Sequence, residues 1–369
     1  MEEEDLFYTL ALTKVIGVGP IIGKRLIEHF GSAKGVFQAT PDACRLKRVS
    51  EGLITNLQEV QVLRWAEKEL KLIQKLDILP LYYRAPTYPF YLKQCDDAPL
   101  LLFYKGTKLP DWTSRPILSV VGTRTPTPRG MAFCAQIMEV VQPFNPIVIS
   151  GLAYGIDACV HREALAFGLE TFGILGHGLQ RIYPAIHAKL AKQMMRQGGL
   201  LTEFPIQSRI ERENFVQRNR IVAGMSQATI VVESALKGGS MSSIGFANEY
   251  NRDAFAVPGR VDDLMSQGCN ELIRTLRAQL LQQPSEIIDV LNWNRTAPKT
   301  KVVQPQLFVH LEEEAQRVFD YLCGVEREVI DLIAIECNLP IYKVSTLLLQ
   351  LELQGLVKPL PGKYFERLN

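Results

Sequence analysis

Two arginines, an asparagine and a phenylalanine lie close together in ENFVQRNRIVAGMS, residues 213–226. On a helix with about 100° between successive residues, Phe215 and Asn219 share a face and Arg218 lies at its edge. Arg220 points nearly the opposite way, so the two arginines either bind successive phosphates, or one binds while the other braces the fold. A phenylalanine beside arginines favours single-stranded over duplex nucleic acid, since an aromatic ring stacks on any unpaired base for about 1–3 kcal/mol. The alternative is a phenylalanine in the core with arginines on the surface.

A second candidate segment is SVVGTRTPTPRG, residues 119–130, where a predicted strand ends at Gly122 and a helix follows. A phosphate at this helix start would meet backbone amides, the hydroxyl of Thr123 and the guanidinium of Arg124. The segment lacks the GxGxxG pattern, so it carries no dinucleotide-binding fingerprint. As an alternative, Arg124 forms a salt bridge with a neighbouring acid.

Small residues mark two further strand ends. Ser150 and Gly151 open SGLAYGIDACVH, and their size lets a ligand approach the backbone closely. In VVESALKGGSMSS, Gly239 and Ser240 precede an apolar helix, which is typical of an anion cradle, although a tight turn alone also explains them.

Asp157 and His161 are four residues apart on the predicted helix of the first of these segments, so their side chains can meet. Such a pair is either a catalytic dyad or an orienting pair that ties the helix to its loop. We favour the orienting pair, because no nucleophile is evident nearby.

A glycine-rich turn near the N-terminus, VIGVGPIIGKRLIEHFG, places Gly17 and Gly19 just before a proline that can open a helix. A glycine hairpin that leads into a helix exposes backbone N–H groups, which suit a phosphate. The segment resembles a helix-hairpin-helix, a motif that binds the DNA backbone without sequence preference. A turn that only packs two helices is the alternative.

The elements that position these segments follow from hydrophobic periodicity. From about residue 115 to 290, short β-branched runs alternate with helical patterns, which predicts a mostly parallel sheet of the α/β class with its ligands at the carboxyl ends of the strands. We predict a helical domain at residues 1–78, a core at 79–293, a linker at 294–310 and a three-helix tail with a hairpin at 311–369, which matches a winged helix. The candidate recognition helix of the tail carries a lone lysine, Lys343, so we expect the tail to contact protein or to dimerise and not to read duplex DNA.

Composition narrows the function further. The chain has 369 residues, of which 47% are hydrophobic, and a formal net charge of +2, so any nucleic-acid site must be local. Its seven cysteines are scattered without a CxxC pair, and its five histidines show no ligand spacing, so we expect no disulfide framework, metal or cofactor. The acidic start MEEEDLFYTL does not resemble a secretory signal and no apolar run is long enough to span a bilayer, so we expect a cytoplasmic protein.

Taken together, the segments resemble the DNA-processing protein A family, DprA or Smf. Seven blocks in the same order carry the resemblance: VVGTRTPTPRG, SGLAYGIDACVHREAL, GILGHGLQRIYP, GGLLTEFP, NFVQRNRIVAGMS, VVESALKGGSMSS and AFAVPG with SQGCNELI. The resemblance implies a Rossmann-like core, an N-terminal helical (helix-hairpin-helix, SAM-like) domain and a C-terminal winged-helix domain. It also implies a non-enzymatic, homodimeric protein of natural transformation and recombination that protects single-stranded DNA and loads the recombinase RecA onto it.

The same resemblance implies the residues of the DNA site. Arg124 contacts phosphate, and the remaining contacts are expected from Gly122, Thr123, Ser150, Gly151, Asn214, Phe215, Arg218, Asn219, Arg220, Gly239 and Ser240. The family's usual Ser-Gly-Ser is Gly238-Gly239-Ser240 here, which keeps the small and hydroxyl character of the pocket.

One enzymatic alternative is a nucleotide hydrolase of the lysine-decarboxylase-like group, which shares a Rossmann-like core. The loop of those enzymes reads Pro-Gly-Gly-x-Gly-Thr-x-x-Glu. KGGSMSSIG lacks the later glycine and the threonine at that spacing, and Glu249 comes too late. We therefore favour a binding protein.

Overall fold

The computed structural model describes residues 3–293, 312–325, 327–354, 356–360 and 363–367. The chain divides into two compact units, residues 1–296 and 297–369. The predicted linker, residues 294–310, lies outside the described residues.

The N-terminal segment is helical, as predicted. Its helices are α1 (Glu3–Lys14), α2 (Pro20–Phe30), α3 (Ala33–Gln38), α4 (Pro41–Leu46), α5 (Glu51–Leu57) and α6 (Val60–Lys75). Side chains of Ser32, Thr40 and Ser50 accept hydrogen bonds from first-turn amides of α3, α4 and α5, which explains where these helices begin. Helix α1 packs on α6 through fully buried residues such as Leu10 and Ala66.

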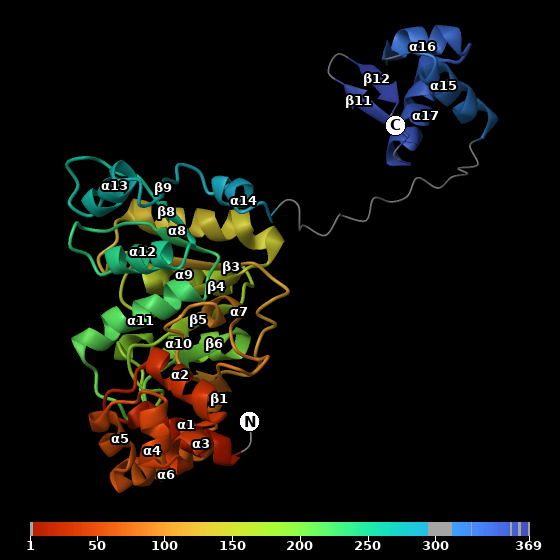
Figure 1. Ribbon diagram of the computed structural model, residues 1–369. Coiled ribbons are helices and arrows are strands. Elements are labelled where there is room, and N and C mark those ends of the chain that lie inside the picture. Colours follow the sequence, from red (N-terminus) through yellow and green to blue (C-terminus); the bar gives the residue numbers. More distant parts are fainter. Residues whose placement is uncertain (1–2, 294–311, 326, 355, 361–362, 368–369) are drawn as a thin grey trace. The chain divides into compact units, whose positions relative to one another are not determined.

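A nine-stranded sheet forms the core of the first unit (Figure 1), in the order β1-β2-β6-β5-β4-β3-β7-β8-β9. Its strands are β1 (Leu79–Tyr82), β2 (Leu101–Lys105), β3 (Ile117–Val121), β4 (Ile147–Ser150), β5 (Thr171–Ile174), β6 (Gly199–Thr202), β7 (Ala228–Val231), β8 (Asp253–Ala256) and β9 (Gln279–Leu280). The strands from β6 to β9 pair in parallel, whereas β1 and β2 form an antiparallel edge. The predicted, mostly parallel α/β fold is confirmed.

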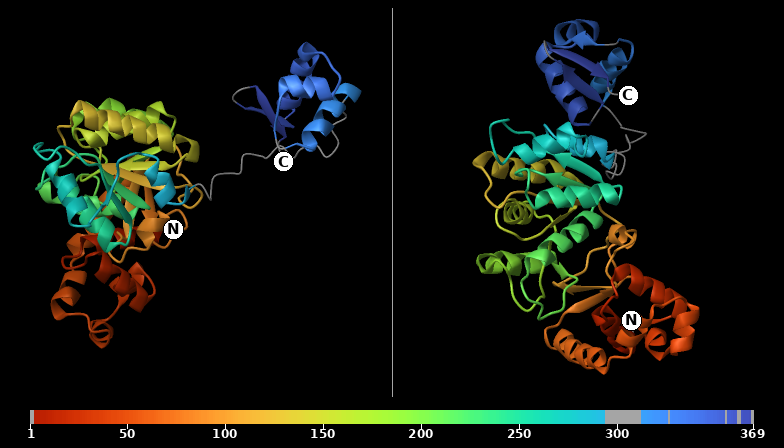
Figure 2. Two further views of the ribbon diagram at one scale, coloured as in Figure 1. Left: turned by 90° about the horizontal axis from the view of Figure 1, so that it is seen from above. Right: turned by 60° about the vertical axis from the view of Figure 1, so that its left-hand side comes forward.

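Helices cover both faces of this sheet (Figures 1 and 2) because its strands alternate their side chains. On β3, Leu118 and Val120 pack with residues of α8 (Pro128–Val141) and α9 (Ile156–Ala166). Ile117 and Val121 point to the other face and pack with residues of α11 (Arg212–Gly224) and α12 (Ser240–Glu249). Full burial stabilises the fold by about 1.5–3 kcal/mol per large aliphatic side chain.

The remaining elements of this unit are short or peripheral. They are α7 (Phe90–Lys93), η1 (Gln142–Phe144), η2 (Ala185–His187), α10 (Ala188–Gln197), α13 (Gln267–Arg274) and α14 (Glu286–Val290). Helix α10 packs on β5, β6 and α9, so it extends the helical layer that α8 and α9 begin.

The second unit contains the predicted three helices and hairpin. Its elements are α15 (Glu313–Cys323), β10 (Glu328–Val329), α16 (Ile330–Glu336), α17 (Ile341–Leu353), β11 (Val357–Leu360) and β12 (Tyr364–Arg367). The strands pair antiparallel in the order β10-β12-β11, and the helices enclose a separate apolar core. The Lys343 ammonium lies 2.6 Å from a carboxylate oxygen of Glu314.

Within the described ranges, no single helix is both long and apolar enough to cross a bilayer. Helices α16 and α17 meet the length and composition test only as a pair, bent by 107°.

Candidate nucleic-acid interface

The predicted site lies at the carboxyl edge of the sheet. Strand β3 lies between β4 on one side and β7 on the other, so the chain order reverses beside β3. In open α/β sheets ligands bind at this switch point. Segments after β3, β4, β5 and β7 meet here, which brings together most of the residues predicted from sequence.

Main-chain bonds join the loops of this edge. The Thr123 amide donates to the Glu233 carbonyl at 2.7 Å, and the Ile156 amide donates to the Thr123 carbonyl at 3.1 Å. Gly155 has a φ of +79°, and a Cβ at this position would overlap the Thr123 carbonyl oxygen. A Cβ on Gly122 would lie 2.6 Å from Cγ1 of Ile156. The loops after β3, β4 and β7 therefore fit together only with glycine at these positions.

The start of α8, where a phosphate was expected, is closed by a carboxylate of the protein itself. The Thr127 amide donates to Oε2 of Glu233 at 2.9 Å, and the Thr127 hydroxyl donates to Oε1. The Thr127 hydroxyl also accepts from the Gly130 amide at 3.1 Å, which completes the cap. A negative group at a helix N-terminus is stabilising, and here Glu233 supplies it. The expectation that this helix start holds a phosphate is therefore wrong.

Arg124 extends from the same loop into solvent. In the part of the chain that the structure describes, its guanidinium has neither a hydrogen-bonding nor an ion-pair partner, so the alternative of a salt bridge is not observed. The hydroxyl of Thr123 is engaged with Thr125 at 3.4 Å and with the Met265 sulfur at 3.3 Å. Arg124 is therefore the freely available cation of this loop.

Arg218 is buried beneath the loop after β4. Its Nη1 donates to the Ile174 carbonyl at 2.6 Å, and its Nε is buried without a partner among the described residues. A Cβ on Gly151 would overlap the guanidinium, so a larger residue there would displace Arg218 from its present position. Burial lowers the pKa of Arg218, the Asp157 charge opposes this effect, and the Arg124 charge reinforces it. Arg218 and Arg124 therefore repel each other, and an anion between them would relieve that repulsion.

Asp157 and His161 do not bond to each other in the structure. Asp157 accepts a hydrogen bond from the Ala153 amide at 3.3 Å, and burial raises its pKa although the Arg218 charge opposes the shift. His161 Nδ1 instead bonds to the Thr171 hydroxyl at 2.6 Å, and burial lowers its pKa to about 3. Neither a catalytic dyad nor the preferred orienting pair is formed by these two residues.

The position of Arg220 differs from the prediction that it contacts DNA. Its Nη1 donates to the Asp97 carbonyl at 2.7 Å, and its Nη2 pairs with Glu203. Only 7% of its side chain is exposed. Arg220 braces the fold on the other side of α11, and we withdraw it from the predicted DNA contacts. Burial also raises the pKa of Glu203 to about 7, against the opposing charge of Arg220.

Asn219 holds the start of α12 in place. Its Nδ2 donates to the Gly239 carbonyl at 3.2 Å and to the Ser242 hydroxyl at 3.0 Å. Ser240 is buried and donates to the Ser234 hydroxyl at 2.7 Å, so its side chain is also structural. Gly239 is exposed, no side chain caps α12, and among the described residues the Gly239 amide has no acceptor. The start of α12 is therefore an open anion cradle.

Phe215 is half-buried near the start of α11. Its ring lies against Gly176 and 5.8 Å from the ring of Tyr183, with 54° between the planes. Tyr183, which is 43% exposed, was not predicted, although it belongs to the quoted block GILGHGLQRIYP. Asn214 is also half-buried, and its side chain donates to the Arg209 carbonyl at 3.4 Å. The aromatic pair is a small stacking surface beside Arg218.

Two predictions concern residues away from this surface. The Ser150 side chain is fully buried and donates to the Val120 carbonyl at 2.6 Å, so we withdraw it as a DNA contact. Gly17 and Gly19 lie in the turn between α1 and α2, outside the carboxyl edge. Among the described residues, no three His, Cys, Asp or Glu side chains are grouped as a metal site.

The fold and site define a class: a Rossmann-like α/β protein whose sheet edge carries an exposed arginine, an uncapped helix start and an aromatic pair. A family model described as DNA recombination-mediator protein A matches residues 80–292, and a DprA winged helix domain matches residues 304–363. Protein Smf of Synechocystis is 32% identical over 403 residues and covers 100% of both chains. The chain belongs to the DprA/Smf family.

Solved structures agree with this assignment. The X-ray structure of DprA from Streptococcus pneumoniae matches with a TM-score of 0.65 and 27% identity, over 78% of this chain and 98% of that chain. A structure that concerns the single-stranded DNA binding mode of DprA from Helicobacter pylori matches with a TM-score of 0.52 and 26% identity, over 59% of this chain and 96% of that chain.

Proposed function

We propose that this protein binds single-stranded DNA at the carboxyl edge of its sheet, in the cytoplasm, during natural transformation or recombination. The observation that carries the proposal is the exposed Arg124 guanidinium, which has no partner among the described residues and whose charge acts on the buried Arg218. Family membership and the DNA-binding relative from Helicobacter pylori support it.

Stacking explains the preference for an unpaired strand. Phe215 and Tyr183 present ring surface beside the phosphate-binding groups, and stacking contributes about 1–3 kcal/mol per base without reading sequence. Bases in duplex DNA are already stacked and are read from the grooves. The proposed site therefore has phosphate contacts that position the strand and an aromatic pair that tolerates any base.

Arg124→Ala tests the proposal. The variant is expected to bind single-stranded oligonucleotides of all sequences more weakly and to reduce the slope of log affinity against log salt by about 1, as the loss of one phosphate contact does. Fluorescence anisotropy over a salt series measures both quantities, with Arg64→Ala on the exposed face of α6 as the matched control. An unchanged slope, or wild-type protein that prefers duplex DNA, would contradict the proposed site.

The wider role is part of the same proposal. The protein acts as a homodimer that protects the strand and loads RecA onto it, and the winged helix contributes protein contacts. The description of the family as a recombination mediator supports this role. Faster RecA filament formation on single-stranded DNA in the presence of wild-type protein, but not of Arg124→Ala, would support loading, and equal rates would refute it.

We also propose that the protein binds without catalysis. Support comes from His161 and Asp157, which are both engaged elsewhere and do not form an acid–base pair. Incubation with nucleoside monophosphates is expected to release no free base above background. Release above background would revive the hydrolase alternative.

A further inference from the structure

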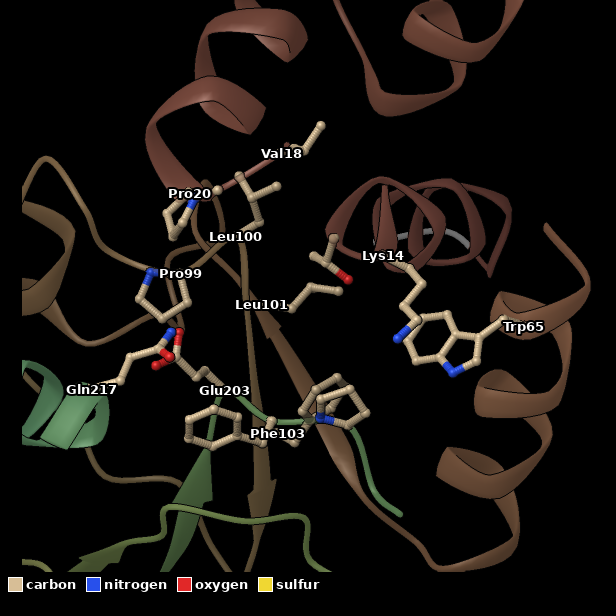
Figure 3. A pocket seen from close by; sticks show the side chains of 14 residues that line it. Lys14, Val18, Pro20, Trp65, Pro99, Leu100, Leu101, Phe103, Glu203 and Gln217 are labelled. Carbon is tan, nitrogen blue, oxygen red and sulfur yellow. The ribbon is translucent and has the colours of Figure 1, made fainter. Parts of the chain in front are cut away.

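A pocket of about 230 Å³ lies between the N-terminal helices and the core (Figure 3). Its walls come from the α1–α2 turn, α6, β2, the segment after β6, and Gln217 of α11. We propose that this pocket takes one base of the bound DNA strand, preferentially a base with an exocyclic amino group, while the adjoining phosphate lies against the α1–α2 turn. The inference rests on the proposed single-strand function and adds a second nucleotide site to it.

The polar end of the pocket is formed by Glu203. One carboxylate oxygen, Oε2, pairs with Arg220, whereas the other, Oε1, is buried without a partner among the described residues. The exposed Gln217 side chain points toward this carboxylate (Figure 3). A buried acceptor that lacks a donor costs about 1–3 kcal/mol, so a ligand that supplies an N–H group there gains affinity. Cytosine, adenine and guanine carry such an amino group, and thymine does not.

The rest of the pocket suits a flat ring. Its floor and sides are apolar and are formed by Pro99, Leu100, Leu101, Phe103, Phe204 and Pro205. Its volume is below the roughly 300–1,000 Å³ that holds a drug-sized molecule, which limits the occupant to a group about as large as one base.

The other side of the pocket offers groups that bind phosphate. Lys14 lies 5.5 Å from the ring centroid of Trp65, and Figure 3 shows both on the side opposite Glu203. Gly17 has a φ of +87°, and Gly19 opens α2 without a side-chain cap. Pro20 has no N–H and the Val18 amide donates to the Val15 carbonyl, so among the turn residues that line the pocket the Gly19 amide, together with Lys14, is the group that attracts a phosphate. The sequence predicts that this turn binds the DNA backbone. It is not part of the site at the carboxyl edge.

Continuity with the first site favours DNA over other occupants. Gln217 lies two residues after Phe215 on α11, and the intervening Val216 is 48% exposed. Because residues two apart on a helix point about 200° apart, a strand that leaves the Phe215–Tyr183 pair has to cross α11 over Val216 to reach the pocket. A basic peptide would also complement Glu203, but it would not use Lys14 or the amides of the α1–α2 turn.

The test compares homopolymeric dC and dT oligonucleotides of equal length by anisotropy, at about pH 8, where Glu203 is ionised because its pKa is about 7. Wild-type protein is expected to prefer dC by about fivefold, which corresponds to one net hydrogen bond. Glu203→Gln presents an N–H donor in place of the carboxylate oxygen, so the dC to dT ratio is expected to fall to one or reverse. Glu139→Gln, exposed on α8, is the matched control and should keep the ratio.

Two further measurements do not depend on how well the Glu203 variant folds. Lys14→Ala is expected to weaken dC and dT binding alike, relative to Lys192→Ala on α10. Oligonucleotides with 5-iododeoxycytidine are expected to crosslink wild-type protein at Trp65, Phe103 or Phe204, in addition to Phe215 or Tyr183.

The outcomes separate the two proposals. Binding that depends on Arg124 but shows no crosslink in the pocket and the same dC to dT ratio in Glu203→Gln would overturn the second site and leave the first intact. Absence of single-strand binding by wild-type protein would overturn both. Binding of an oligolysine peptide that Glu203→Gln abolishes, with an unchanged dC to dT ratio, would assign the pocket to a peptide.

Discussion

Helices α8 and α12 both begin directly after strands of the same sheet edge, yet their starts differ. The start of α8 is occupied by the Glu233 carboxylate, whereas the start of α12 is uncapped and exposes Gly239. Both looked like anion cradles in the sequence. A glycine- or threonine-containing turn at a helix start is open to a ligand only when no carboxylate of the protein itself binds the N–H groups there.

The two arginines of α11, Arg218 and Arg220, also differ in the groups that surround them. Arg220 pairs with Glu203, whereas Arg218 donates to the Ile174 carbonyl and feels the charges of both Asp157 and Arg124; Arg124 has no partner among the described residues. Internal carboxylates therefore occupy Arg220 and the start of α8, and leave Arg124 and the start of α12 exposed. Three predictions test this separation, in order of decreasing expected effect.

Glu203→Gln is expected to change how stability depends on pH. The folded-state pKa of Glu203 is raised from 4.5 to about 7, so the folded protein retains this proton where the unfolded chain releases it. The raised pKa of Glu203 adds to the free energy of unfolding. This stabilisation is complete below about pH 4.5 and is lost as the pH rises through about 7, for a total of about 3 kcal/mol. Urea unfolding across this range should show a shallower decline for Glu203→Gln than for Glu139→Gln, and parallel curves would contradict the assignment.

Gly239→Pro tests the open start of α12. The φ of Gly239 is −62°, which proline adopts, so the substitution chiefly removes the amide hydrogen. Loss of one hydrogen bond to phosphate is expected to cost about 2 kcal/mol of binding free energy, or roughly 30-fold in affinity. Gly239→Ala keeps the amide, and its Cβ meets nothing within 4 Å, so it serves as the control. Equal affinities of the two variants in anisotropy would show that this amide does not bind DNA.

Glu233→Gln tests the closed start of α8. The amide keeps an acceptor for Thr127 but removes the negative charge from the helix start, so the free energy of unfolding is expected to fall by about 0.5–1 kcal/mol. Single-strand affinity should stay within about twofold of wild type, because the start of α8 is not a phosphate site. A large gain in affinity, measured beside urea unfolding, would mean that Glu233 competes with DNA for this helix start.

Hydrophobic periodicity and short motifs were sufficient to predict much of the secondary structure of this protein. The alternating pattern predicted β3, β4, β5, β7 and β8 and the helices between them, and the helical wheel placed Arg218 and Arg220 on different sides of α11. Strands β1, β2, β6 and β9 were missed, because a run of two to five residues carries too little periodicity to separate a strand from a buried helix segment or a loop.

What the sequence could not reveal were partners far apart in the chain. Nothing local to Arg220 indicates Asp97, and nothing local to the start of α8 indicates Glu233. The burial of Ser150 also depends on a carbonyl of the neighbouring strand, that of Val120. Such contacts exist only once the sheet has brought the strands together.

The main-chain bonds among Thr123, Ile156 and Glu233 have a consequence for both evolution and engineering. Because main-chain bonds and buried side chains such as Glu233 hold these loops together, the outline of the binding edge is insensitive to most substitutions at exposed positions such as Thr125 or Leu236. Binding also spends little entropy on ordering the loops, because they are already held in place. Proteins of this fold that share about a third of their residues therefore keep the same loop conformation while their exposed, ligand-contacting residues differ.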